Sequence, residues 1–185
     1  IQGTSVAKVF NKVFATTGNN VGQLRAKGLP FQQIHAHRGN HAGYYPDSTN
    51  IALKLIYDPK TLKVLGAQAV GQEGTEKRID VIASVMKMGG TIYDLQDMEL
   101  SYAPPFSAAK DPVNILGYIA QNIDEGVYKT VEWDEIDDII AGGGYLLDVH
   151  TPVEFGAGHV EGSHNLELDT LRDHIDEIPV GKDEP

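Results

Sequence analysis

The feature that most limits what this chain can fold into is an alternation of apolar side chains in residues 51–57. Every second position, from Ile51 to Tyr57, is apolar, which is the period of a β-strand that buries one face. Residues 58–61 (Asp-Pro-Lys-Thr) supply turn chemistry, because proline presets the backbone and Asp caps its own turn. Residues 63–70 then predict a returning strand, so an antiparallel hairpin is expected.

Helices are predicted on both sides of this hairpin. Apolar residues at i, i+3, i+4 and i+7 predict a helix over 76–88, and Asp111 before Pro112 predicts the N-cap and first turn of a helix that stops near Gly126. Shorter elements are expected at 21–27 (helix), 31–37 (strand) and 92–96 (helix). This order of helices, antiparallel strands and helices predicts an α+β domain.

The first seventeen residues carry a helical spacing as well. Apolar side chains recur there at intervals of three and four residues, and Gly18 follows as a stop signal. The spacing predicts a helix with one apolar face, formed by Val6, Val9, Phe10, Val13 and Phe14.

The composition changes at residues 125–127, where we place a domain boundary. Residues 127–185 carry 15 of the 26 acidic side chains, against three Lys and Arg residues. Helix at 133–141, strand at 145–149 and helix at 171–178 alternate there, with Thr151 and Pro152 opening a further helical turn. Such alternation predicts a second, α/β module.

The overall composition excludes several classes of protein. A net charge of −11 argues against a nucleic-acid partner, since phosphate binding needs a basic surface. No run approaches the ~18 apolar residues of a membrane helix, so we expect a cytoplasmic protein. The chain holds no cysteine, which leaves no thiol nucleophile or zinc–thiolate site in these residues. Its start, Ile-Gln-Gly-Thr, lacks methionine and favours a piece of a longer protein.

Residues 101–114 (SYAPPFSAAKDPVN) form the most informative segment. Two consecutive prolines, Pro104 and Pro105, predict a rigid, extended stretch that holds the neighbouring Tyr102 in place. A preoriented phenol can donate a hydrogen bond to a developing anion such as a thiolate or persulfide. The alternative is a structural tyrosine with a buried ring and a satisfied hydroxyl.

This segment resembles the signature of the C-terminal dimerisation domain of coenzyme A-disulfide reductases and related NADH oxidases. Residues 41–46 (HAGYYP) resemble a second stretch of that family, and residues 66–71 and 73–80 resemble its strand and long helix. Residues 3–10 resemble the final helix of the preceding flavin domain. The resemblance therefore divides the chain into 1–18, the end of a flavin domain, and 19–125, the dimerisation domain.

The resemblance implies specific roles. In a homodimer, this domain caps the partner subunit's active site, with Tyr44 and Tyr102 acting as catalytic hydrogen-bond donors or proton sources to a thiolate. Pro104, Pro105 and Phe106 would lie on the flavin side of the partner subunit. The parent enzyme would hold FAD and use NADH or NADPH to reduce a disulfide or persulfide, with coenzyme A as the expected substrate or ligand. This fragment would bind no cofactor by itself and would be inactive alone.

A second resemblance covers residues 147–165 (LDVHTPVEFGAGHVEGSHN), which are similar to the rhodanese pattern. It implies structural roles for Asp148 and Glu154, while His150 stands where rhodaneses carry arginine, a bidentate and permanently charged donor. The chain stops before the loop that carries the rhodanese catalytic cysteine. Residues 126–185 are thus expected to be the N-terminal part of an α/β rhodanese-like domain that cannot transfer sulfur as given.

Three alternatives stay open at this stage. His35, His37 and His41 lie close together, but no carboxylate is suitably spaced, so ordinary histidines are favoured over a metal site. A non-catalytic dimerising scaffold could reuse both folds. An NADH oxidase would share this domain with a disulfide reductase, because the residues that separate the two lie outside the chain.

Overall fold

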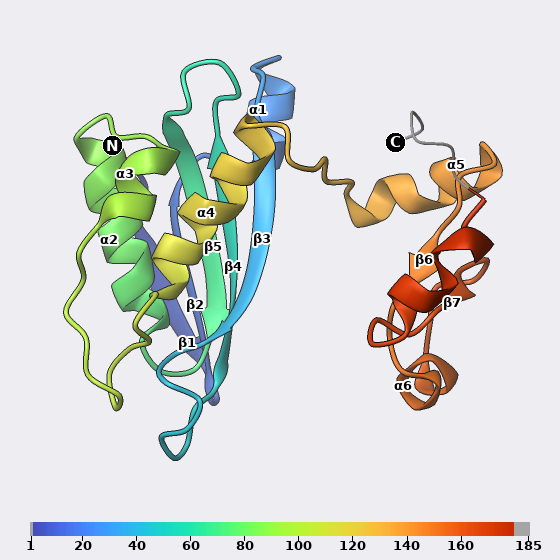
Figure 1. The fold of residues 1–185 in the computed structure, drawn as a ribbon. Helices are drawn as coiled ribbons and strands as arrows, with labels where there is room; N and C mark the ends of the chain where they lie inside the picture. The colour runs from blue at the N-terminus through green and yellow to red at the C-terminus, as the bar shows by residue number, and fades with distance from the viewer. Residues whose placement is uncertain (1, 180–185) are drawn as a thin grey trace. The chain divides into compact units, whose positions relative to one another are not determined.

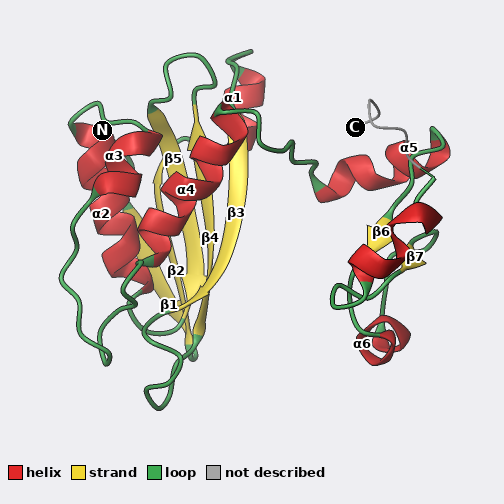
Figure 2. Cartoon of the chain, in the orientation of Figure 1, coloured by secondary structure: helices red, strands yellow, loops and turns green. Residues whose placement is uncertain are grey.

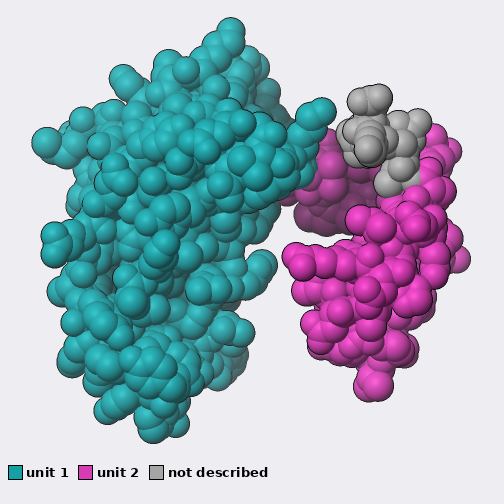
Figure 3. Space-filling view, in the orientation of Figure 1, with its two compact units in different colours: residues 1–130 teal, residues 131–185 magenta. Residues whose placement is uncertain are grey.

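The computed structural model describes residues 2–179, which form two compact units, one ending at Thr130 and the other beginning at Val131 (Figure 3). The first unit is built on a five-stranded antiparallel sheet with the strand order β1-β2-β5-β4-β3 (Figure 1). Its strands are β1 (Ser5–Val9), β2 (Lys12–Gly18), β3 (Gln32–Gly39), β4 (Asn50–Tyr57) and β5 (Val64–Gly71). The predicted hairpin of β4 and β5 is confirmed, with Leu53 opposite Ala69 in its register.

Helices cover one face of this sheet (Figure 2). They are α2 (Thr75–Lys87), α3 (Ile92–Asp97) and α4 (Pro112–Asp124), whereas the short α1 (Val21–Ala26) connects β2 with β3. Each helix lies where its sequence pattern predicts it. The predicted cap of α4 is also confirmed, because the Asp111 carboxylate accepts a hydrogen bond of 3.1 Å from the Val113 N–H.

A continuous apolar core lies between the sheet and the helices. It combines the alternate inward positions of β3, β4 and β5 with one stripe of each helix. Removing each such side chain from water stabilises the fold by about 1.5–3 kcal/mol. The most completely buried members include Ile34, Leu53, Leu55, Ile79, Ile82, Leu95 and Leu116. This packing makes the first unit a rigid support for the loops at its ends.

The helix predicted for the first seventeen residues, and interpreted as the last helix of a flavin domain, is wrong. These residues form the antiparallel hairpin β1–β2, which turns at Phe10 and Asn11 and joins the sheet through β5. The apolar side chains that suggested a helical face do not share a buried side, since Phe10 is 94% exposed at the turn. Ala15 and Thr17 are buried instead, at the alternation of a strand.

The second unit contains short elements. A 3₁₀ turn at Trp133–Glu135 leads into α5 (Ile136–Ala141), and β6 (Leu147–Asp148) pairs in parallel with β7 (His164–Asn165) across α6 (Pro152–Ala157). A 3₁₀ helix follows at Leu171–Glu177. The predicted alternation of helix and strand is confirmed here. None of the described residues from Val131 onward is fully buried.

Two helical glycines test how tightly the first unit is packed. A Cβ on Gly117 of α4 would lie 2.5 Å from the backbone nitrogen of Gln96, whereas on Gly22 of α1 its nearest neighbour is the Asn20 side chain at 3.4 Å. We expect Gly117→Ala to lower the free energy of unfolding by about 1–3 kcal/mol. Gly22→Ala should leave it unchanged or raise it by up to about 1 kcal/mol. Urea unfolding of both variants measures this, and equal effects would contradict the packing.

Candidate functional site

Two loops meet at the end of the sheet where β3 ends and β4 begins. Residues 40–49 connect these two strands, and residues 98–111 connect α3 with α4. The Ala42 N–H donates to the Ser107 carbonyl across the two loops at 3.0 Å. Both residues are buried, so this backbone contact holds the loops together beneath the surface.

The tips of the two loops bring the predicted tyrosines together. The hydroxyl oxygens of Tyr44 and Tyr102 lie 3.0 Å apart, so one phenol donates a hydrogen bond to the other. The residues are 58 positions apart in sequence, and nothing in their motifs shows that they touch. Both stay accessible, with Tyr44 78% and Tyr102 47% exposed. The pair is therefore a fixed hydrogen-bonding unit on an open surface.

The pairing changes the acidity of Tyr102. Its hydrogen bond with Tyr44, and to a lesser degree its partial desolvation, raise the pKa of the Tyr102 phenol above its ordinary value. Tyr102 therefore keeps its proton at neutral pH. A neutral phenol is the form that can donate a hydrogen bond to an anion.

Tyr45 contacts a different partner from its neighbour Tyr44. Its ring meets the ring of His41 edge to face, with 5.7 Å between the centroids. Its N–H donates to the Ala42 carbonyl at 2.9 Å, so residues 42–45 form a turn. Of these two neighbours, Tyr44 therefore pairs with Tyr102, whereas Tyr45 packs against His41.

The two prolines of the second loop lie in a tight turn. The Phe106 N–H donates to the Ala103 carbonyl at 2.9 Å, which places Pro104 and Pro105 inside the turn, so the predicted extended stretch is wrong here. The buried Ser107 hydroxyl closes the loop by donating to the Ser101 carbonyl at 3.0 Å. Phe106 remains 71% exposed, so the loop presents an apolar aromatic surface as well as a phenol.

Beneath the loops lies Arg78, a buried cation whose role sequence reasoning missed. Its side chain in α2 is 2% exposed and pairs with the equally buried Asp111 carboxylate at 2.7 Å. Nη2 also donates to the Asn40 carbonyl at 2.7 Å, and Nη1 donates to the Gly74 carbonyl at 3.0 Å. A signal existed in the sequence, because Arg78 shares an i, i+4, i+7 stripe with Ile82 and Val85, both buried.

Asn114 secures the other end of the second loop. Its amide nitrogen lies within 3.2 Å of the carbonyl oxygens of Leu95, Gln96 and Met98, which end α3. Its Oδ1 accepts from the Asp111 N–H at 3.1 Å. The Asp-Pro-x-Asn part of the motif is thus explained by loop anchoring.

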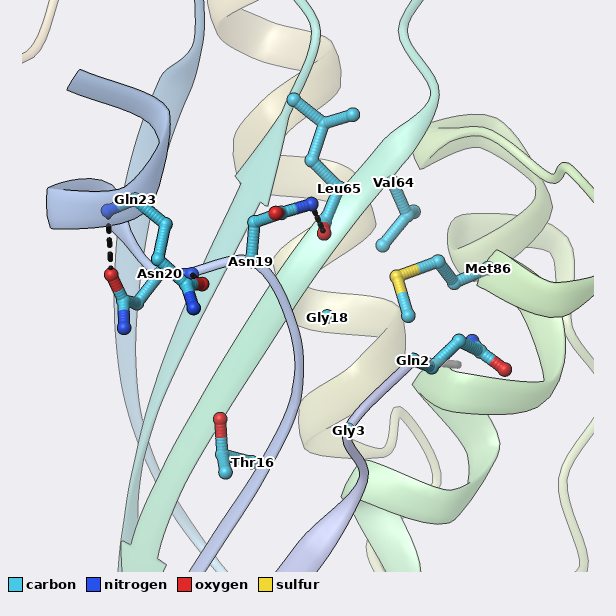
Figure 4. Close-up of a pocket in the computed structure, with 10 residues that line it drawn as sticks. All are labelled: Gln2, Gly3, Thr16, Gly18, Asn19, Asn20, Gln23, Val64, Leu65 and Met86. Carbon is cyan, nitrogen blue, oxygen red and sulfur yellow. Dashed lines mark hydrogen bonds between the residues drawn. The ribbon is translucent and has the colours of Figure 1, made fainter. Parts of the chain in front are cut away.

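A separate cavity of about 550 Å³ lies at the opposite end of the sheet (Figure 4). Asn19, Gln23 and Met86 contribute to its walls, and its lining contains neither a titratable side chain nor a nucleophile beyond the Thr16 hydroxyl. The Asn19 N–H already donates to the Leu65 carbonyl at 2.9 Å. Apart from the Thr16 hydroxyl this cavity carries no reactive group, so we place the candidate site at the tyrosine pair.

The described residues show no cluster of three or more His, Cys, Asp or Glu side chains able to hold a metal ion. His41 is buried, and its Nδ1 lies 3.1 Å from the Ala42 carbonyl oxygen. His37 lies exposed on β3. None of the helices in residues 2–179 combines the length and hydropathy that crossing a bilayer requires.

In the second unit, the residues singled out by sequence form local contacts. Asp148 accepts from the His150 N–H at 2.9 Å, which is the main reason that the pKa of its carboxyl is lowered. Glu154 accepts from the Thr151 hydroxyl at 2.7 Å, which is the main reason that the pKa of its carboxyl is lowered. Its carboxylate also accepts from the Thr151 N–H at 3.0 Å, which closes the cap of α6. The His159 ring stacks on Phe155 with 3.8 Å between centroids. These contacts anchor the loop between β6 and β7.

Comparison with known proteins supplies the family. Residues 4–112 match the model of the pyridine nucleotide-disulphide oxidoreductase dimerisation domain. The chain belongs to this family. The match includes the β1–β2 hairpin, both loops of the candidate site and Arg78.

Individual relatives agree with this assignment. A coenzyme A disulfide reductase of Staphylococcus haemolyticus is 40% identical over 121 residues, which are 65% of this chain and 27% of the relative. The solved structure of reduced Bacillus anthracis CoADR-RHD is 50% identical with a TM-score of 0.95, covering 98% of this chain and 32% of that one. An NAD-dependent persulfide reductase from A. fulgidus is 33% identical with a TM-score of 0.86, covering 97% and 32%. The chain thus spans about a third or less of the length of these relatives.

The tyrosine pair predicts a measurable coupling. Replacing Tyr44 by phenylalanine removes the main cause of the raised Tyr102 pKa, so Tyr102 should titrate at a lower pH in Tyr44→Phe. Carbon-13 NMR of tyrosine labelled at Cζ follows each phenol separately. Tyr93→Phe is the control, because Tyr93 hydrogen-bonds to Asp124 instead. An unchanged Tyr102 titration in Tyr44→Phe would show that the two hydroxyls do not pair in solution.

Proposed function

We propose that this chain is the C-terminal part of an FAD-dependent NAD(P)H:disulfide or persulfide oxidoreductase of the coenzyme A-disulfide reductase type. In a homodimer, its first unit completes the active site of the partner subunit. The observation that carries this proposal is the Tyr44–Tyr102 pair, which is hydrogen-bonded, exposed and fixed on a rigid domain. The 50% identity to the CoADR-RHD structure and 40% identity to a coenzyme A disulfide reductase support the substrate class.

The chemistry needs a donor beside a sulfur anion. Reduction of a disulfide or persulfide releases a thiolate or a hydrosulfide-type anion, whose charge a positioned O–H stabilises. In the pair, one phenol donates its proton to the oxygen of the other, so the hydroxyl proton of the accepting phenol is free to point outward. Accepting a hydrogen bond polarises that second O–H, because hydrogen bonds in a chain strengthen one another. The raised pKa of Tyr102 favours the protonated phenol, which is the form that donates to the anion.

FAD and the nicotinamide supply the electrons and would be held by residues outside this chain. Within the chain, Pro104, Pro105 and Phe106 would cover the flavin side of the partner's site. Phe106 fits such a role because it is 71% exposed on the same loop that carries Tyr102. These residues would exclude water from the reacting sulfur atoms.

We propose that residues 126–185, which include the second unit, are the N-terminal part of a rhodanese-like domain. The parallel pairing of β6 with β7 across α6 supports an α/β module. The Asn165 side-chain amide connects β7 to the end of β6 by donating to the Asp148 and His150 carbonyls at 3.1 and 2.7 Å. In the parent enzyme, a complete domain of this kind would deliver sulfane sulfur to the reductase, whereas residues 126–185 alone carry no cysteine to transfer it.

The test uses the full-length flavoprotein encoded by the intact gene. Tyr102→Phe and Tyr44→Phe should each lower kcat for disulfide or persulfide reduction about 10²-fold, the usual cost of one lost anion-stabilising donor. Rapid anaerobic reduction of the flavin by NADH should stay normal, because the tyrosines act after that step. Tyr93→Phe serves as the matched control on the same domain. Turnover that survives both phenol deletions would exclude the tyrosine pair from catalysis.

A further inference from the structure

Three segments of the first unit converge on the guanidinium of Arg78. Its Nη2 reaches the Asn40 carbonyl, at the start of the loop that carries Tyr44. Its Nε and Nη2 reach the two carboxylate oxygens of Asp111, at the end of the loop that carries Tyr102, at 3.3 and 2.7 Å. Its Nη1 reaches the Gly74 carbonyl, at the start of α2 itself. One rigid, planar group therefore contacts the ends of both tyrosine loops.

Three contacts join the two loops, and they form successive levels from the buried interior to the surface. Arg78 joins Asn40 to Asp111 at the base. The backbone hydrogen bond from Ala42 to Ser107 follows, at 3.0 Å. The Tyr44 and Tyr102 hydroxyls close the stack at the surface. Of these levels, only the base is charged, bidentate and almost completely buried.

From this arrangement we propose that Arg78 is a positioning residue, which sets the distance between the Tyr44 and Tyr102 hydroxyls by holding both loops from below. The proposal rests on the proposed function of the tyrosine pair for its catalytic meaning, but the geometry it describes belongs to this chain alone. Arginine suits the role because its planar fork fixes the directions of several hydrogen bonds at once. A lysine ammonium in the same place is a single point charge that cannot hold Asn40 and both Asp111 oxygens in that geometry.

The first experiment introduces Arg78→Lys into the 185-residue chain and measures two local properties. The Tyr102 pKa should fall toward the value found in Tyr44→Phe, because the loops separate and the phenols lose their contact. At neutral pH, the Ala42 amide should exchange its hydrogen faster, while the amides of β4 and β5 keep their protection. Arg25→Lys in α1, where the arginine is exposed, is the control and should match the parent chain in both properties.

A second pair of variants moves the guanidinium without removing it. A Cβ on Gly74 would lie against Nη1 of Arg78, whereas a Cβ on Gly89, at the other end of α2, meets nothing within 4 Å. Both glycines have a positive φ, of 69° and 75°, so alanine carries similar backbone strain at each. Gly74→Ala should therefore change the Tyr102 titration and the Ala42 exchange, and Gly89→Ala should change neither.

The outcomes separate a positioning role from a general one. A folded Arg78→Lys chain with the Tyr102 pKa and Ala42 exchange of the parent overturns the proposal. So does a Gly74→Ala chain that behaves like Gly89→Ala, or one whose β4 and β5 amides lose protection together with Ala42. Failure of the proposed function looks different. In that case Arg78→Lys still shifts the Tyr102 titration, yet Tyr44→Phe and Tyr102→Phe leave turnover of the full-length enzyme unchanged.

Discussion

The buried ion pair between Arg78 and Asp111 is the interaction on which the candidate site depends. Taking both charges out of water is costly, and the pair is stable only because its remaining hydrogen-bonding groups are satisfied. Here Asp111 also caps α4, and Arg78 also binds the Asn40 and Gly74 carbonyls. Removing one partner of such a pair costs about 3–5 kcal/mol, since an uncompensated charge stays behind. The pair thus connects helix α2, the first turn of α4 and both loops to one another.

The sheet and its helices explain how the buried Arg78–Asp111 pair can hold loops whose tips lie at the surface. Antiparallel pairing of β3 with β4 places the start and end of the first loop side by side, with Gly39 opposite Asn50. Helices α2 and α4 bring Arg78 and Asp111 to the same end. The apolar side chains packed between these layers keep the supports from shifting, because close-packed interiors transmit displacement. Tyr44, Tyr102 and Phe106 are then left exposed on a rigid base, and this is the surface that we propose a partner subunit covers.

Much of this fold follows from short-range pattern. Three local patterns predict structure that the folded chain retains: the alternation in β4, the Asp-Pro turn and the cap at Asp111. The helix prediction for the N-terminal residues was wrong because an i, i+3, i+4 spacing of valines and phenylalanines fits a helix as well as two short strands. The pairing of β2 with β5 decides between the two. Tyr44 and Tyr102 could be singled out separately from their motifs. Their contact, and the role of Arg78 beneath them, depend on which loops the topology brings together, and local pattern does not contain that information.

The most direct test of the central claim, that this chain completes a site on the partner subunit, is complementation in mixed dimers. One full-length subunit would carry Tyr44→Phe and Tyr102→Phe. The other would lack the redox cysteine that the family resemblance implies for the parent enzyme, and which this cysteine-free chain does not contain. If the tyrosines act across the dimer, each mixed dimer holds one complete site, and we expect about half of the parent activity per dimer from two inactive proteins. Mixed dimers as inactive as their parents would contradict the claim, because the phenols would then serve the subunit that carries them.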